Sequence, residues 1–115
     1  MAQAIARARH IDIAPRKVRL VADMIRGKKV QEARDILAYT VKISAPVVSK
    51  VLEAAVANAE NKAAETRERI NTDEMVITEI MVDGGRTARR YQSAPRGRAT
   101  RIRKRSSHLM LTIKD

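Results

Sequence analysis

The 115-residue sequence predicts a small α+β domain from which a long basic β-hairpin protrudes. Apolar residues recur at helical spacing through the first half of the chain, and two later segments have the composition and alternation of strands. The 26 mostly polar residues around the junction of those strands, Asp83–His108, are rich in arginine and cannot form a core. We therefore expect a single domain, with a globular body at residues 1–83 and 107–115 and an extended hairpin at about residues 84–106.

The first elements are a strand and a helix. Residues 2–11 place isoleucine and arginine on one face and small alanines on the other, which is typical of a strand packed closely under a helix. Pro15 suits the first turn of a helix because no N–H is needed there. Apolar residues at helical spacing follow from Val18 to Ile25, and Gly27 is well placed to end this helix.

Two further helices are expected at residues 30–39 and 45–66. Ser44, followed by Pro46, is typical of a hydroxyl cap with proline in the first turn. The buried stripe of the longer helix is expected to consist of Val48, Val51, Leu52, Ala55 and Ala59.

The two later strands are expected at residues 75–82 and 109–113, where aliphatic and β-branched residues dominate. A turn or a hinge is expected at Gly84 and Gly85, since the spacing of a phosphate-binding loop is missing there. Hairpin arms of about eleven residues, at about 3.3 Å each, would reach roughly 35 Å from the body.

The charge of the chain is concentrated in this hairpin. From Gly84 to Lys114 there are ten Lys and Arg residues and no acid, whereas the preceding 83 residues carry a net charge of +2. Nine of the ten lie between Arg86 and Arg105, and eight of those nine are arginines. A cationic run without acids repels itself and needs a polyanion, of which a nucleic-acid backbone is the commonest. The forked donors of arginine suit phosphates, so the run predicts a nucleic-acid-binding hairpin.

A second basic surface is predicted around the first helix, from Arg16, Lys17, Arg19, Arg26, Lys28 and Lys29. These side chains either contact phosphate or form an ordinary solvated helix face with Asp23 as an ion-pair partner. The sequence leaves both interpretations open.

Other classes of function find little support. The chain has no cysteine, and His10 and His108 are too few to form a structural zinc site, so we expect surface or RNA-contacting histidines and no metal. No nucleophile–base constellation is visible, so we expect no catalytic residue, no cofactor and no small-molecule substrate. With only Tyr39 and Tyr91, stacking platforms like those of RNA-recognition motifs are excluded. No membrane-spanning run and no secretory signal is present, which favours the cytoplasm.

Three segments resemble one known family. Residues 14–28 (APRKVRLVADMIRGK) resemble the first helix of the bacterial large-subunit ribosomal protein L twenty-two family, also called the universal uL twenty-two family. Residues 57–61 (ANAEN) resemble its third-helix signature, and residues 97–108 (GRATRIRKRSSH) are similar to its returning hairpin arm.

The resemblance implies a three-stranded antiparallel sheet packed on three helices, and a hairpin that threads through large-subunit rRNA. It implies a tip that lines the nascent-peptide exit tunnel, near Pro95, Arg96, Gly97, Arg98 and Ala99. The expected partners are large-subunit rRNA, neighbouring ribosomal proteins and the nascent polypeptide. The residues expected to bind rRNA are Arg7, Arg9, Arg16, Lys17, Arg19, Arg26, Lys28, Lys29, Arg86, Arg89, Arg90, Arg96, Arg98, Arg101, Arg103, Lys104, Arg105, Ser106 and His108.

Two other functions stay open on the residues alone. A DNA-bending architectural protein can also use basic hairpin arms, and Pro95 could serve as the apolar wedge that such proteins insert between base steps. A basic ribonuclease would need a histidine or carboxylate pair in a cleft, with His10 or His108 as the candidates.

Overall fold

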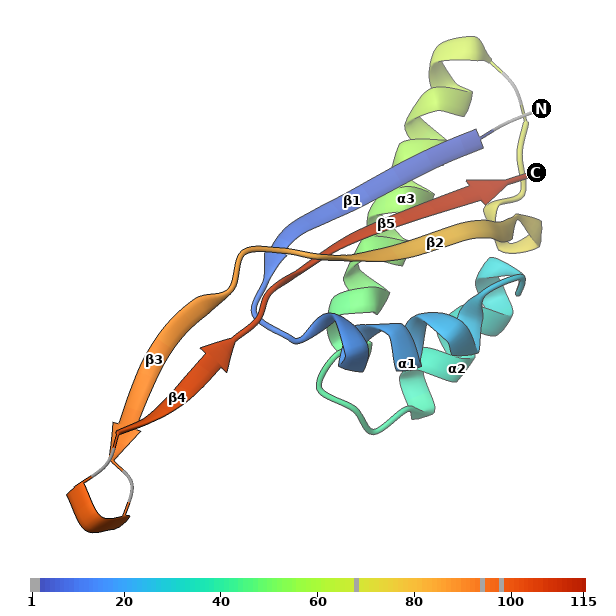
Figure 1. The fold of residues 1–115 in the computed structure, drawn as a ribbon. Coiled ribbons are helices and arrows are strands. Elements are labelled where there is room, and N and C mark those ends of the chain that lie inside the picture. Colours follow the sequence, from blue (N-terminus) through green and yellow to red (C-terminus); the bar gives the residue numbers. More distant parts are fainter. Residues whose placement is uncertain (1–2, 68, 94, 98) are drawn as a thin grey trace.

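The computed structural model describes residues 3–67, 69–93, 95–97 and 99–115, which form a body of helices and one sheet with a hairpin extending from it (Figure 1). The helices are α1 (Pro15–Ile25), α2 (Val30–Tyr39) and α3 (Ala45–Thr66), with short 3₁₀ turns η1 (Thr72–Glu74) and η2 (Pro95–Gly97). The strands are β1 (Gln3–Ile11), β2 (Val76–Gly84), β3 (Ala88–Ser93), β4 (Ala99–Lys104) and β5 (Ser107–Lys114). The predicted α+β class is confirmed.

The body sheet has the strand order β1-β5-β2, and both pairings are antiparallel. β5 is therefore the central strand, although it follows the other two in the chain. Gln3 and Val76 lie opposite Lys114 at one end of the sheet, and Gly84 lies opposite Ser107 at the other. The three-stranded antiparallel sheet that the resemblance implied is confirmed, and β2 runs past its predicted end at residue 82 to Gly84.

The helices leave one face of the sheet open. α1 packs on β2, α3 packs on β1 and β5, and α2 packs against the other two helices (Figure 1). Ala4 and Ala6 are buried beneath α3, whereas Ile5 on the opposite face of β1 is exposed, as the alternation predicted. The face away from the helices is thus available for contacts outside the body.

The helices bury the apolar residues whose spacing in the sequence predicted an inward-facing stripe. α1 buries Val18, Val21, Ala22 and Ile25. α3 buries all five predicted stripe residues and adds Ala45, Val56 and Ala63. Many of these side chains are small, so the helices lie close to the sheet.

α3 also covers the free edge of β1. The side-chain amide of Asn58 donates to the Ile5 carbonyl at 2.9 Å, and Lys62 Nζ donates to the Gln3 carbonyl at 3.1 Å. Unpaired carbonyls on an edge strand are otherwise open to another chain. Asn58, which lies in the third-helix signature, therefore has a structural role within the body.

The connection after α1 turns at Gly27, which has the left-handed φ of 79°. The prediction that glycine ends this helix is confirmed. Its N–H, however, donates to the Ile77 carbonyl at 3.0 Å rather than back into the helix. Ile77 N–H donates in turn to the Lys28 carbonyl at 2.9 Å. The turn is thereby fixed to the start of β2.

The predicted hydroxyl cap at Ser44 is wrong. Ser44 has helical backbone angles, with φ −83° and ψ −16°, and its side chain makes no cap hydrogen bond. The buried hydroxyl instead lies 3.4 Å from the Lys17 carbonyl, to which it donates. A side chain used to link α3 to α1 is not available to the first turn of its own helix.

Ion pairs join α2, α3 and η1 near the start of β2. Arg34 donates to Glu53 at 2.7 and 3.1 Å and to Asp73 at 2.7 Å. The hydrogen bond to Glu53 raises the pKa of Arg34 above its ordinary value; burial opposes this rise, and the charge of Asp73 adds to it. Lys29 also pairs with Glu74, at 3.1 Å. Part of the charge of the body is thus neutralised internally.

Substitution of Gly27 by alanine should lower the free energy of unfolding by about 1–2 kcal/mol, because an L-residue is strained in the left-handed region. Crowding is not the cause, since a Cβ at this position would meet no heavy atom within 4 Å. Urea denaturation measures the change. Gly84→Ala is the matched control, because its Cβ would meet only Pro15 Cγ at 4.0 Å, and it should stay within about 0.5 kcal/mol of the parent. Equal losses in the two variants would contradict the account of the turn.

Candidate nucleic-acid interface

The hairpin is a single antiparallel ladder that projects beyond the body (Figure 1). β3 and β4 pair without a register shift, from Ala88 opposite Lys104 to Ser93 opposite Ala99. The principal extents of the molecule are 67, 27 and 16 Å, so the protruding hairpin that the sequence predicted is confirmed. Each arm is a regular strand over six residues, fewer than the eleven used for the predicted reach, because the ladder is interrupted between the body and Ala88.

The hairpin carries cations on both of its faces. The pairs Arg89–Arg103 and Tyr91–Arg101 share one face, since residues opposite each other in a ladder point the same way. The adjacent pair Arg90–Ile102 therefore points to the other face. All of these arginines are exposed. A surface that is cationic on two sides can contact two strands of a polyanion at once.

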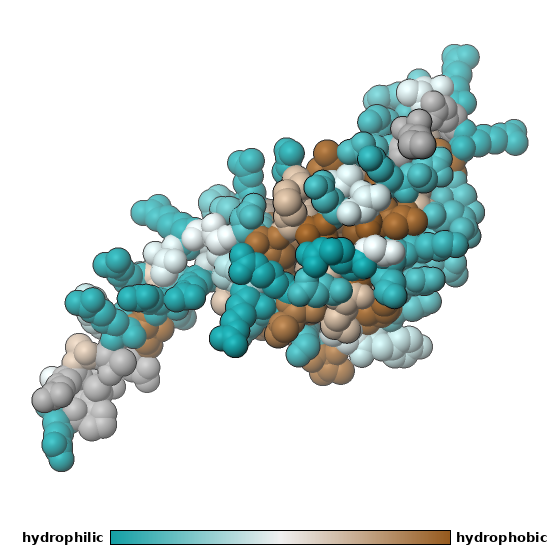
Figure 2. Space-filling view, turned by 45° about the vertical axis from the view of Figure 1, so that its right-hand side comes forward, coloured by the Kyte–Doolittle hydropathy of each residue, from teal (hydrophilic) through white to brown (hydrophobic). Residues whose placement is uncertain are grey.

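The described cations of the hairpin form no ion pair with any acid among the described residues. The ion pairs that the structure describes all lie in the body, where they involve Asp23, Glu53, Asp73 and Glu74. Figure 2 shows hydrophilic side chains projecting along the hairpin, whereas apolar residues gather on the body. Like charges directly opposite one another, as at Arg89 and Arg103, destabilise a ladder. An external anion would remove this repulsion.

The root of the hairpin is built from glycine and serine. Gly84 pairs with Ser107 in the sheet, and Gly85 N–H donates to the Ser106 carbonyl at 2.9 Å. The backbone here forms ladder hydrogen bonds rather than the expected turn, whereas the alternative of a hinge stays a prediction. A Cβ on Gly85 would lie 2.5 Å from Ser106 Oγ, so this glycine permits the close approach of the two arms. Ser106, which was expected to bind rRNA, donates its hydroxyl to the Arg86 carbonyl at 2.6 Å.

The tip is turned by two residues with positive φ, Arg96 at 65° and Gly97 at 70°. Arg96 is exposed, as is Ala99 at the start of β4. Pro95 begins the 3₁₀ turn η2. Arg98, which was expected both at the tip and among the rRNA-binding residues, lies outside the described residues.

Four residues that the sequence suggested as candidates lie together where the hairpin leaves the sheet: Arg7, Arg9, His10 and His108. Arg7 and Arg9 are exposed on β1, and the imidazoles of His10 and His108 lie edge to face with their centroids 5.2 Å apart. The residue that sequence reasoning missed is Asp83, which lies opposite His108 in the ladder and lines the same hollow. A signal existed, because Asp83 is the last acid before the arginine run.

The predicted basic surface of α1 divides into two groups. Arg16, Lys17 and Lys28 are exposed. Arg19 instead donates to the Val82 carbonyl at 3.0 and 3.2 Å, and Arg26 donates to the Ile80 carbonyl at 2.9 Å. These two guanidinium groups tie α1 to β2, a role that the sequence did not predict, and phosphate contact by the basic residues around α1 stays a prediction.

Arg26 and Lys29 also form ion pairs with acidic side chains, as expected for a solvated helix face. Arg26 Nη1 lies 2.5 Å from Asp23 Oδ1, and Lys29 pairs with Glu74. Both side chains remain about half exposed, at 48% and 52%. They can still present charge to a large anion.

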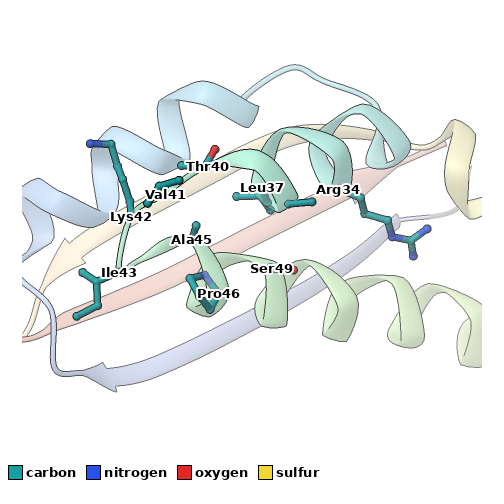
Figure 3. Close-up of a pocket in the computed structure, with 10 residues that line it drawn as sticks. Arg34, Leu37, Thr40, Val41, Lys42, Ile43, Ala45, Pro46 and Ser49 are labelled. Carbon is teal, nitrogen blue, oxygen red and sulfur yellow. The ribbon is translucent and has the colours of Figure 1, made fainter.

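A separate hollow lies between the end of α2 and the start of α3 (Figure 3). Its volume is about 530 Å³, and Leu37, Pro46 and the connecting Val41 and Ile43 line it. Val41 is 98% exposed and Ile43 is 74% exposed, which is unusual for aliphatic residues. These exposed aliphatic side chains form an apolar surface on this loop, next to the exposed Lys42.

Within the described part of the chain, no group of three or more His, Asp and Glu side chains is arranged to hold a metal ion. None of the described helices has the length and apolar character needed to cross a membrane.

Arg19→Ala should lower the free energy of unfolding by about 1 kcal/mol, because the Val82 carbonyl loses both of its guanidinium donors. Arg16→Ala removes the same charge from the same helix at an exposed position, and should change stability by less than about 0.5 kcal/mol. Chemical denaturation of the two variants side by side tests this. Equal stability of the two would show that the contact with Val82 contributes nothing.

The sequence was also compared with known families. The model of the family described as "Ribosomal protein L22p/L17e" matches residues 6–114, nearly the whole of the chain.

Proposed function

Because the chain belongs to the ribosomal protein L22p/L17e family, it is a ribosomal protein of the large subunit, and we propose that its hairpin binds large-subunit rRNA as a structural clamp. The observation that carries this proposal is a thin ladder with arginine on both faces and no acid from Gly84 to Lys114. Folded RNA brings several phosphate backbones close together. A slender cationic element can enter between them where a globular body cannot.

Recognition by this hairpin rests on shape and charge. Arg89, Arg101 and Arg103 project on one face and Arg90 on the other, so separate RNA segments can be contacted on each side. Tyr91, which is 70% exposed beside Arg101, adds one aromatic ring for stacking on an unpaired base. The charge of the hairpin supplies affinity, and its fit into folded RNA supplies specificity.

The tip is proposed to reach the wall of the nascent-peptide exit tunnel. The length of the molecule, 67 Å, supports this role, since the tip is held far from the body. Arg96 and Gly97 with positive φ make a compact end that fits a narrow space. A nascent polypeptide would then pass close to residues 95–97 and 99.

The body is proposed as an anchor among RNA and neighbouring ribosomal proteins. Arg16, Lys17 and Lys28 offer phosphate contacts on the body, and Arg7 and Arg9 do so on the open face of the sheet. The loop with Val41 and Ile43 is the apolar surface best suited to a protein neighbour. The proposed role is structural, with no catalytic step, and its place is the cytoplasmic ribosome.

Each of the single variants Arg101→Ala, Arg103→Ala and Arg105→Ala should reduce the slope of log affinity against log salt concentration by about 0.7–0.9, because each removes one phosphate contact. Filter binding to large-subunit rRNA fragments over a range of salt concentrations measures the slope. Arg34→Ala is the matched control, because it removes an equal charge that is already paired with Glu53 and Asp73.

The control should leave the salt slope unchanged. Affinity that does not depend on salt would refute the clamp. Binding to duplex DNA that is as tight as binding to rRNA at the same salt concentration would instead favour the DNA-bending function.

The amides of β3 and β4 should exchange rapidly with solvent in the free protein and slowly in the rRNA complex. An isolated two-stranded ladder is marginal in water, and opposed arginines weaken it further. Hydrogen exchange followed by mass spectrometry reads the difference. β5, which is paired on both sides, is the internal reference and should be protected in both states. Strong protection of the hairpin without RNA would contradict the expected role of phosphate.

A further inference from the structure

A hollow of about 320 Å³ lies on the sheet where the hairpin leaves the body. Its polar lining comes from three strands and consists of Arg7, Arg9, His10, Asp83 and His108, with Met110 beside them. The register places Arg7, Met110, His108 and Asp83 on the face that the helices leave open. The volume is at the lower end of the range for small-ligand sites, which suits a single planar ring system.

A β-bulge opens this hollow. Ala8 is the last residue of β1 in regular register with Leu109, and Ile11 next pairs with Ser107, so Arg9 and His10 together lie opposite His108. His10 takes the left-handed φ of 58°, which is uncommon for a residue other than glycine. The bulge accounts for this conformation and sets the His10 ring beside His108.

Contacts within the hollow hold the His108 ring. Its Nδ1 accepts a hydrogen bond from the backbone N–H of His10 at 3.3 Å, so the neutral ring carries its proton on Nε2. The absence of a side chain at Gly85 gives the ring its room, since a Cβ there would lie 3.2 Å from Nε2. Two imidazoles at an angle of 84° thus offer a face and an edge to a flat ligand.

Asp83 places a carboxylate in an otherwise cationic hollow, and phosphate binding does not explain this carboxylate. Its carboxylate is exposed among Arg7, Arg9 and the arginine run, and it forms no ion pair with another described residue. A carboxylate repels phosphate and accepts hydrogen bonds from the N–H groups of base edges. Its position suits a ligand that carries donors on one side and a phosphate on another.

We propose that this hollow binds one unstacked base of the rRNA, with guanine preferred. Guanine presents two adjacent donors, N1–H and the 2-amino group, to the two oxygens of Asp83, whereas uracil presents one donor between two acceptors. His10 and His108 pack against the ring, and Arg7 and Arg9 contact the adjoining phosphates. The inference rests on the proposed rRNA-binding function and adds to it a contact that reads base identity.

Titration of the full-length protein with 5′-GMP, 5′-UMP and inorganic phosphate tests the site, with the imidazole NMR signals of His10 and His108 as the readout. GMP should bind roughly tenfold more tightly than UMP, as expected for one bidentate contact. Phosphate that shifts both rings as much as GMP does would overturn the base site in favour of an anion site. Equal affinities for GMP and UMP would remove the guanine preference.

Asp83→Asn should abolish the preference for GMP and weaken rRNA binding without changing the salt slope, because the amide replaces one of the two acceptor oxygens with an NH₂ donor that cannot pair with the second donor of guanine. Glu79→Gln is the matched control: it removes the same charge from β2 at a position outside the hollow, opposite Thr112. That control should leave both the preference and the rRNA affinity unchanged or slightly improved. Asp83→Asn that behaves like Glu79→Gln would refute the role of the carboxylate.

Repeating the GMP titration on the rRNA complex distinguishes failure of the base site from failure of the proposed rRNA-binding function. Bound rRNA fragments should prevent the response of His108 to GMP. A free-nucleotide site would still respond in the complex, and that result would overturn the assignment to an rRNA base. Failure of the parent protein to bind rRNA at all would refute the proposed function, whereas normal rRNA binding with an unoccupied hollow would refute only the base site. Cleavage of the RNA that His108→Ala abolishes would overturn a binding role in favour of catalysis.

Discussion

The antiparallel pairing of β2 with β5 is the constraint on which the structure depends. The ladder runs from Val76 opposite Lys114 to Gly84 opposite Ser107, and Gly85 extends it by one bond to Ser106. Within the body, apolar side chains buried beneath the helices stabilise this pairing. Beyond it, the same two chain segments continue into β3 and β4, where no core supports them. The well-packed ladder of β2 and β5 therefore sets the direction in which the weakly stabilised hairpin extends.

Much of the fold could be predicted because its signals are local. Proline at the start of α1, glycine after its end and the aliphatic spacing of α3 each depend on a few neighbouring residues. The error at Ser44 came from a contact distant in sequence, since the hydroxyl faces Lys17 on another helix. The role of Gly85 was missed for a similar reason. Its absent side chain matters only because Ser106 and His108 approach it across the ladder.

The candidate interface was predictable in its charge and less so in its geometry. The run from Arg86 to Arg105 is evident from composition, but which arginines share a face follows from the register of β3 with β4. Arg19 and Arg26 look the same as Arg16 in the sequence, yet their partners are carbonyls of β2. The bulge at His10 could not be predicted, because strand alternation alone does not reveal a local insertion.

The strand order has a consequence for how the protein acquires its shape during synthesis. β1 and β2 are not neighbours; among the described strands each pairs with β5, which is translated after both of them and after the hairpin. The helices therefore leave the ribosome before the sheet on which they pack is complete. Their apolar faces stay partly uncovered until β5 has been synthesised. Contacts between β1 and β5 span most of the chain, which slows folding by increasing contact order. Until β5 arrives, the nascent chain is vulnerable to aggregation and to proteolysis.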